Sequence, residues 1–213
     1  SPLGFVGALM IGLSHSAVFG YGAVYVSSKG FTLFEISIFM VTISSFGALS
    51  QWPIGYISDK IDRRIILIGI TLIASGLSIF IVISSYLSFI LFIILCGIFS
   101  AMCLPMFSVA VAHVNDFLES NQIISASSTF NILIGIGSII GPILVSSSMT
   151  LIGANGFFIY LFLVHGFLGL FGLYRMTKRA KPKDLESQYI PLPRNISAAG
   201  MEMNPVTEPT EDE

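Results

Sequence analysis

Four stretches of this chain contain no lysine, arginine, aspartate or glutamate, and their lengths limit what the chain can fold into. They cover residues 1–28, 36–58, 65–115 and 120–174, and are 28, 23, 51 and 55 residues long. An α-helix rises about 1.5 Å per residue, so it crosses a hydrocarbon core about 30 Å thick in about 20 residues. The first two stretches therefore each allow one membrane span, and the two longer ones each allow two.

Weak turn signals divide the two longer stretches. Ser84-Ser85-Tyr86 lies in the first, and Gly153-Ala154-Asn155-Gly156 lies in the second. Transmembrane strands would show segments of about ten residues with alternating polar side chains, and these stretches show no such alternation. The predicted fold class is therefore all-α, a polytopic membrane protein with six transmembrane helices. We expect the spans at about residues 3–27, 33–58, 65–84, 88–113, 123–149 and 155–175.

The last part of the chain has a different composition. Residues 177–213 hold five basic residues, seven acidic residues and five of the nine prolines. Such a segment cannot bury enough apolar surface to fold by itself. We therefore expect a membrane domain over residues 1–176 and a disordered cytoplasmic tail over residues 177–213. The chain has no initiating methionine and no basic region typical of a signal peptide, so we expect it to begin partway through a longer protein.

Basic residues near the membrane predict how the spans are oriented. Lys29 would lie alone at one end of the helices. Eight bases would lie at the other end, namely Lys60, Arg63, Arg64, Arg175, Lys178, Arg179, Lys181 and Lys183. Because cytoplasmic loops carry the excess of lysine and arginine, both chain ends are predicted to be cytoplasmic. The expected location is the inner (cytoplasmic) membrane of the cell, as a multi-pass protein.

Five of the six residues from 59 to 64 are charged, between two expected spans. The pattern Gly55-x-x-x-Asp59-Lys60-x-Asp62-Arg63-Arg64 resembles the loop between the second and third helices of a six-helix repeat in the major facilitator superfamily. The usual form there is Gly-x-x-x-Asp-Arg-x-Gly-Arg-Arg/Lys, so Lys60 and Asp62 depart from it.

The resemblance implies one six-helix half of a major facilitator permease, a secondary transporter that moves a small solute by alternating access. The sequence Gln51-Trp52-Pro53-Ile54-Gly55 is also similar to the second half of bacterial permeases of this superfamily whose substrates are unassigned. The polar tail and the missing methionine favour the C-terminal half, and the N-terminal half is the alternative. The implied partners are the lipid bilayer, the other six-helix half and a small-molecule substrate, with no nucleic acid, cofactor or metal.

The resemblance also implies roles for individual residues. Gly55, Asp59, Lys60, Arg63 and Arg64 would form a conformational latch loop, in which Asp59 contacts a helix of the other half. A solvated loop that only sets the topology is the alternative interpretation.

The first, second, fourth and fifth spans would line the central cavity by the same resemblance. The polar residues within them make His15, Gln51 and Asn131 the candidate substrate contacts. A hydrogen bond to a neighbouring helix explains each of them equally well.

Small residues predict one close helix contact. Gly4, Ala8, Gly12, Ser16 and Gly20 recur every fourth residue and so share one face, which lets helix backbones approach. In the fifth span, Gly137-x-x-x-Gly141-Pro142 resembles part of a glycine-proline motif of drug/proton antiporters, and a kinked, closely packed helix explains it as well.

No carboxylate lies inside an expected span, so the coupling ion stays open. Proton coupling would use the other half, Glu35 at the outer end of the second span, or an imidazole such as that of His15. Sodium coupling and uniport are the alternatives. Few polar groups among many apolar ones indicate an uncharged or amphipathic substrate.

An enzyme and a non-transporting scaffold are the two competing classes of function. The chain contains no Gly-x-Ser-x-Gly, no His-Glu-x-x-His and no paired intramembrane carboxylates, which argues against an enzyme. A non-transporting membrane scaffold or interaction module, derived from a half permease, is the alternative to a transporter.

Overall fold

The computed structural model describes residues 2–118 and 122–178, except the side chains of residues 123 and 124. These residues form the helices α1 (Pro2–Ser28), α2 (Leu33–Ser58), α3 (Arg63–Ser84), α4 (Phe89–Cys103), α5 (Met106–Asn115), α6 (Ile123–Ile152) and α7 (Gly156–Lys178). Together they provide six segments long and apolar enough to cross a membrane, because α4 and α5 belong to one segment, Phe89–Asn115. The predicted all-α, six-span fold is confirmed. The tail is expected from residue 177, but residues 177 and 178 still belong to α7, and the rest of it, from residue 179 onward, lies outside the described residues.

The helix ends follow local sequence signals, and they differ from the expected bounds by at most three residues. Thr32 and Glu35 form a reciprocal capping box that starts α2. Asp62 caps the N-terminus of α3, where its side chain accepts from the backbone N–H of Arg64 at 3.0 Å. Gly153 follows α6 with a φ of 81°, a left-handed conformation that favours glycine.

The fourth span is interrupted, which the sequence analysis did not predict. α4 ends at Cys103 and α5 begins at Met106, with Leu104 and Pro105 between them. Proline has no backbone N–H, and its ring conflicts with the carbonyl four residues earlier, so it breaks or kinks a helix interior. The fourth span therefore consists of two helical segments joined at its middle.

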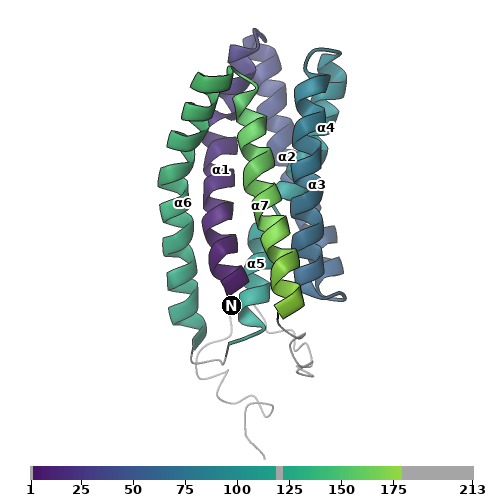
Figure 1. The fold of residues 1–213 in the computed structure, drawn as a ribbon. Helices are drawn as coiled ribbons and strands as arrows, with labels where there is room; N and C mark the ends of the chain where they lie inside the picture. Colours follow the sequence, from purple (N-terminus) through teal and green to yellow (C-terminus); the bar gives the residue numbers. More distant parts are fainter. Residues whose placement is uncertain (1, 119–121, 179–213) are drawn as a thin grey trace, which may run out of the picture. The chain divides into compact units, whose positions relative to one another are not determined.

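Short loops make successive spans antiparallel (Figure 1). α1 packs along α6 and also contacts α2, α5 and α7, while α3 contacts α4 and α7. α2 packs mainly against α4. The N-terminus of α1, the α2–α3 loop, the end of α5 and the end of α7 lie at one end of the bundle.

Glycines allow the close contact between α1 and α6. A β-carbon added to Gly12 would clash with the carbonyl oxygen of Ile134 and would lie 3.0 Å from the Cα of Gly137. A β-carbon on Gly141 would meet Ser16 Oγ, and it would lie 3.1 Å from the Cα of Leu13. The small residues of the two helices thus face each other at the middle of the spans, although Gly20 of the same stripe has open space beside it.

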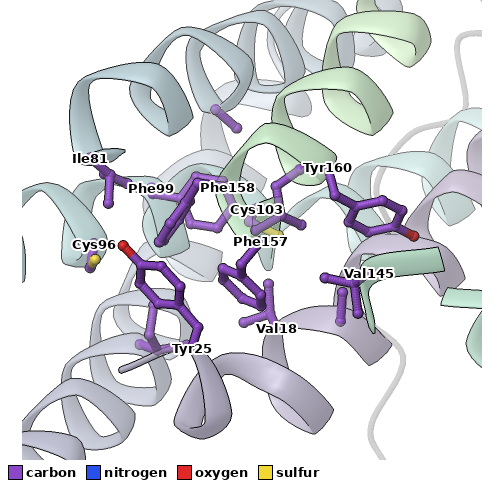
Figure 2. Close-up of a cluster of buried hydrophobic side chains, with 14 of the residues drawn as sticks. Val18, Tyr25, Ile81, Cys96, Phe99, Cys103, Val145, Phe157, Phe158 and Tyr160 are labelled. Atoms are coloured by element: carbon purple, nitrogen blue, oxygen red, sulfur yellow. The ribbon is translucent and has the colours of Figure 1, made fainter. Parts of the chain in front are cut away.

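Aromatic rings fill the core near the opposite end of the bundle (Figure 2). Tyr25 of α1 stacks on Phe157 of α7 with ring centroids 5.0 Å apart, and it meets Phe158 edge-on at 5.1 Å. Phe92 of α4 lies 6.2 Å from the same tyrosine ring. Stacked and edge-on pairs of this kind stabilise a core beyond simple area burial, so they fix α1, α4 and α7 to one another.

Three loops meet at that opposite end of the bundle. Lys29 Nζ donates to Asn155 Oδ1 at 3.0 Å and lies 3.7 Å from the ring centroid of Tyr86. Asn155 Nδ2 in turn donates to the Tyr86 hydroxyl at 2.7 Å. The α1–α2, α3–α4 and α6–α7 loops are therefore tied together by one cation–π contact and two hydrogen bonds.

Candidate functional site

A network of ion pairs connects three helices at the end of the bundle that holds the α2–α3 loop. Arg63 Nη2, at the start of α3, donates to Asp59 Oδ1, the C-cap of α2, at 2.9 Å. Arg63 Nη1 also forms an ion pair with Asp116, directly after α5, and donates to the carbonyl of Ala112 at 3.2 Å. One guanidinium thus joins α2, α3 and α5 through charge-assisted hydrogen bonds. Asp116 is a member of this network that the sequence analysis left out.

The two carboxylates in this network differ in exposure. The Asp59 side chain is 68% exposed and that of Asp116 is 32% exposed. Burial raises the pKa of Asp116, although Arg63 acts in the opposite direction. Burial therefore outweighs the pairing at Asp116, whereas Asp59 stays a solvent-facing carboxylate at the end of α2.

A second, more buried ion pair lies beside the first. Arg64 Nη2 donates to Asp62 Oδ2 at 2.7 Å, with the side chains 9% and 13% exposed. The hydrogen bond from Arg64 lowers the pKa of Asp62, which favours its charged form. Asp62 occupies the position where the family pattern has glycine. Its carboxylate has two structural roles there, because it caps the N-terminus of α3 and neutralises the buried Arg64.

The remaining two residues of the expected latch loop face outward. Lys60 is exposed, and its ammonium lies 4.1 Å from the ring centroid of Tyr56. A β-carbon on Gly55 would have no atom of the described residues within 4 Å. The face of α2 that carries Gly55 is therefore open beside Asp59, as a contact with another helix would require.

The three polar cavity candidates occupy different places in the bundle. Gln51 on α2 and Asn131 on α6 are exposed, and within the described residues neither has a hydrogen-bond partner. His15 is half-buried on α1, and its Nε2 lies 3.1 Å from the backbone carbonyl of Cys103. No hydrogen bond among the described residues joins any two of the three. Gly47, four residues before Gln51 on α2, packs against α4, where a β-carbon would lie 2.8 Å from Ser100 Oγ.

A buried polar cluster lies behind His15. His165 of α7 is fully buried, and its Nε2 shares a hydrogen bond with Ser14 Oγ at 2.9 Å. The same nitrogen lies 3.7 Å from Cys103 Sγ, which is 3.4 Å from Ser14 Oγ. No sequence pattern marked His165 as a candidate, because the sixth span is not one of the four expected to line the cavity. Its contacts, which link α1, α4 and α7, could not be read from residue spacing.

A small cavity of about 140 Å³ lies between α5 and α6. Its lining is mostly apolar, with two carboxamides, and consists of Phe107, Val111, Val114, Asn115, Ala126, Ser127, Phe130 and Asn131. An engineered apolar cavity of about 150 Å³ holds benzene, so this one accommodates a group of that size. Neither a charged side chain nor a cluster of three or more metal-ligating residues occurs there in the described residues.

Comparisons with known proteins agree with the family that the loop pattern suggested. The family model described as "Major Facilitator Superfamily" matches residues 4–198. Similar curated proteins include "Uncharacterized MFS-type transporter YcaD" from the Escherichia coli strains O139:H28 (E24377A / ETEC), O9:H4 (HS) and K12 / DH10B. Each is 27% identical over 158 residues, which are 74% of this chain and 40% of the relative. The chain spans less than half the length of these relatives. No solved structure matches it significantly.

Proposed function

Because this chain belongs to the Major Facilitator Superfamily, we propose that it forms one six-helix half of a secondary transporter in the cytoplasmic membrane. The complete transporter moves a small solute by alternating access, with the substrate site between two related halves. Family membership points to a transporter rather than an enzyme. The N-terminal end of α1 and the C-terminal end of α7 are proposed to be cytoplasmic.

The observation that carries this proposal is the exposure of two carboxamides on the two least buried helices. In an apolar stretch of 18 residues, 17% of the residues are buried in α2 and in α6, whereas 44–56% are buried in the corresponding stretches of the other four spans. Gln51 and Asn131 lie on these two helices, and polar groups are costly to expose to lipid. These faces therefore call for a protein partner or a water-filled cavity, which a second six-helix half supplies.

The small cavity indicates the class of substrate. It presents two phenylalanine rings, 6.1 Å apart, together with the carboxamides of Asn115 and Asn131. Carboxamides donate and accept hydrogen bonds without adding charge. The arrangement suits an uncharged amphipathic solute with a ring-sized apolar part and at least one hydroxyl or amide group.

The test is a flux assay in proteoliposomes, using the complete polypeptide that contains residues 1–213 and, for comparison, the 213-residue chain alone. The solutes are phenyl β-glucoside, glucose, leucine and glutamate, all radiolabelled. We expect saturable uptake of phenyl β-glucoside by the complete protein and none by the chain alone, since one wall of the site would be missing.

Each other outcome has a definite meaning. Uptake restricted to glutamate would contradict the uncharged substrate class while keeping the transporter. Saturable uptake by residues 1–213 as a monomer would contradict the half-transporter proposal. No flux of any solute, together with cysteines at both ends that never change accessibility, would favour the non-transporting scaffold.

A further inference from the structure

We propose that His15 is a proton-binding site, where the proton binds at Nδ1 while Nε2 stays bonded to the end of α4. The role of this site in coupling rests on the proposed transport function. The site itself is defined by the contacts of one imidazole ring and is testable without any transport.

The hydrogen bond to Cys103 fixes which ring nitrogen carries hydrogen. Nε2 of His15 lies 3.1 Å from the carbonyl oxygen of Cys103. A carbonyl oxygen only accepts, so Nε2 must carry the hydrogen. A neutral imidazole carries one N–H, which leaves a lone pair on Nδ1. A proton from water can therefore add at Nδ1 without breaking the contact to α4.

His15 and His165 lie in the same region but differ in how far their side chains are buried. The His15 side chain is only half-buried, and its Nδ1 is not among the enclosed, unpartnered polar atoms of the described residues. His165 is fully buried, with Nε2 bonded to Ser14 and Nδ1 enclosed. A proton that reaches the surface of the bundle can thus bind to His15, whereas His165 offers no free, accessible nitrogen.

The end of α4 favours a positive charge at this place. Cys103 is the last residue of α4, and the last four carbonyls of a helix have no partner within it. These carbonyls carry the partial negative charge of the helix terminus, which stabilises nearby cations. Hydrogen bonds donated by a charged group are also shorter and stronger than neutral ones. Protonation of His15 is therefore expected to tighten its bond to Cys103.

Few ionisable groups face His15 from the surrounding helices. Cys103 faces it from α4 and His165 from α7. α2 between residues 36 and 55, and α6 between residues 123 and 152, contain no ionisable side chain. Within the described spans, no carboxylate competes for a proton at this depth, so His15 is the accessible base there.

The position of the bond gives it a mechanical role. Cys103 directly precedes Leu104 and Pro105, where the fourth span is interrupted. A proton on His15 holds α1 against the segment that ends at this break, and loss of the proton to water loosens that contact. Proton binding is thereby linked to the angle between α4 and α5, the part of the bundle best suited to bend.

The first experiment is a pH titration by NMR of the chain in detergent micelles, with ¹⁵N-labelled histidine side chains. His113 and His165 serve as internal references, and the His15→Gln variant assigns the signals. We expect His15 to carry hydrogen at Nε2 at high pH and to gain a proton at Nδ1 as the pH falls from 9 to 4. His165 should keep its neutral form over the same range. Hydrogen at Nδ1 of His15 at high pH, or no titration between pH 4 and 9, would overturn the site.

The second experiment tests coupling in the complete transporter. Glutamine at position 15 keeps an N–H donor for the Cys103 carbonyl but has no nitrogen that binds a proton in this pH range. We expect His15→Gln to lower accumulation driven by a pH gradient at least tenfold while solute exchange at equal pH continues. An unchanged response to the gradient would overturn the coupling role. No flux in the unaltered protein would instead count against the proposed transport function, and the NMR result would be unaffected by it.

Discussion

The guanidinium of Arg63 donates to the carboxylate of Asp59 at 2.9 Å and so joins the first residue of α3 to the C-cap of α2. The same guanidinium binds Asp116 after α5. Two acidic residues that lie 57 positions apart therefore depend on one base. This relationship allows the contributions of the three charges to be separated by mutation.

Arg63→Gln is expected to be the most destabilising neutral substitution in this network. It leaves the half-buried carboxylate of Asp116 without its cation. Removing one partner of a buried ion pair lowers the unfolding free energy by more than the intact pair contributes to it, because the remaining charge is unpaired. We expect a loss of about 1.5–3 kcal/mol of unfolding free energy, the range for hydrogen bonds to charged groups. The free energy is measured by reversible denaturation in mixed micelles.

Asp116→Asn provides the matched control for that measurement. It removes the carboxylate whose burial opposes its charge, so we expect a change within about 1 kcal/mol. Combined with Arg63→Gln, it should recover part of the lost stability. If the double variant were as unstable as the sum of the two single variants, the two side chains would not be coupled.

Asp59→Asn is expected to change transport without unfolding the protein. Asp59 is 68% exposed, so its pair with Arg63 contributes at most about 1 kcal/mol to stability. In the complete transporter, the open face at Gly55 would let a helix of the other half contact Asp59 and hold the outward-open state. Loss of that contact should lower the transport rate and raise cysteine labelling of the cytoplasmic cavity. Unchanged transport and unchanged labelling would mean that the loop only sets topology.

The sequence predicted the helices because span length and hydropathy are local properties. The runs without charge limited each helix, and the bases around Arg63 identified the loop. Contacts across helices carry no such local signal. Asp116 has no local signal, because acidic residues have little weight in predicting topology, yet folding brings it to Arg63, 53 positions away. The same holds for Ser14 and His165, whose hydrogen bond spans 151 positions. The break at Pro105 had a local signal, but proline is tolerated in many membrane helices, so its position alone could not predict an interruption.

Gly12→Ala should weaken the contact between α1 and α6. The new β-carbon would clash with the Ile134 carbonyl, which is backbone and cannot rotate away. The two helices would have to separate, and overpacking of this kind costs about 1–3 kcal/mol. The midpoint of thermal unfolding, followed by circular dichroism in detergent, should therefore fall.

Gly20→Ala is the control on the same helix. No atom of the described residues lies within 4 Å of a β-carbon at Gly20, and alanine favours helix by up to about 1 kcal/mol over glycine. Its unfolding midpoint should stay the same or rise slightly. If both substitutions changed the unfolding midpoint equally, the α1–α6 contact would not require glycine at position 12.

Acid should remove the stability that Asp62 contributes. The hydrogen bond from Arg64 lowers the pKa of Asp62 below its ordinary value of 3.8. A lowered folded-state pKa means that the contribution is present above the unfolded-state value and is lost as pH falls through the folded-state value. Unfolding free energy should thus drop below about pH 4, and Asp62→Asn should remove this part of the drop. Asparagine still caps α3, so its cost at neutral pH, about 1.5–3 kcal/mol, reports the lost pairing with Arg64. Equal acid sensitivity of both proteins would contradict this role.

The orientation of the bundle is best tested at two exposed positions at its opposite ends. Lys60 lies in the α2–α3 loop and Ser28 ends α1, and both side chains are exposed. Cys96 and Cys103 are buried, so replacing them by alanine gives a background without reactive thiols. Among the described residues, five bases at the end that holds Lys60 favour the cytoplasm for that end, namely Lys60, Arg63, Arg64, Arg175 and Lys178. In intact cells, an impermeant maleimide should therefore label Ser28→Cys and spare Lys60→Cys until the membrane is opened. Labelling of position 60 in sealed cells would invert the topology and place the Asp59 network, with any latch it forms, on the outer side.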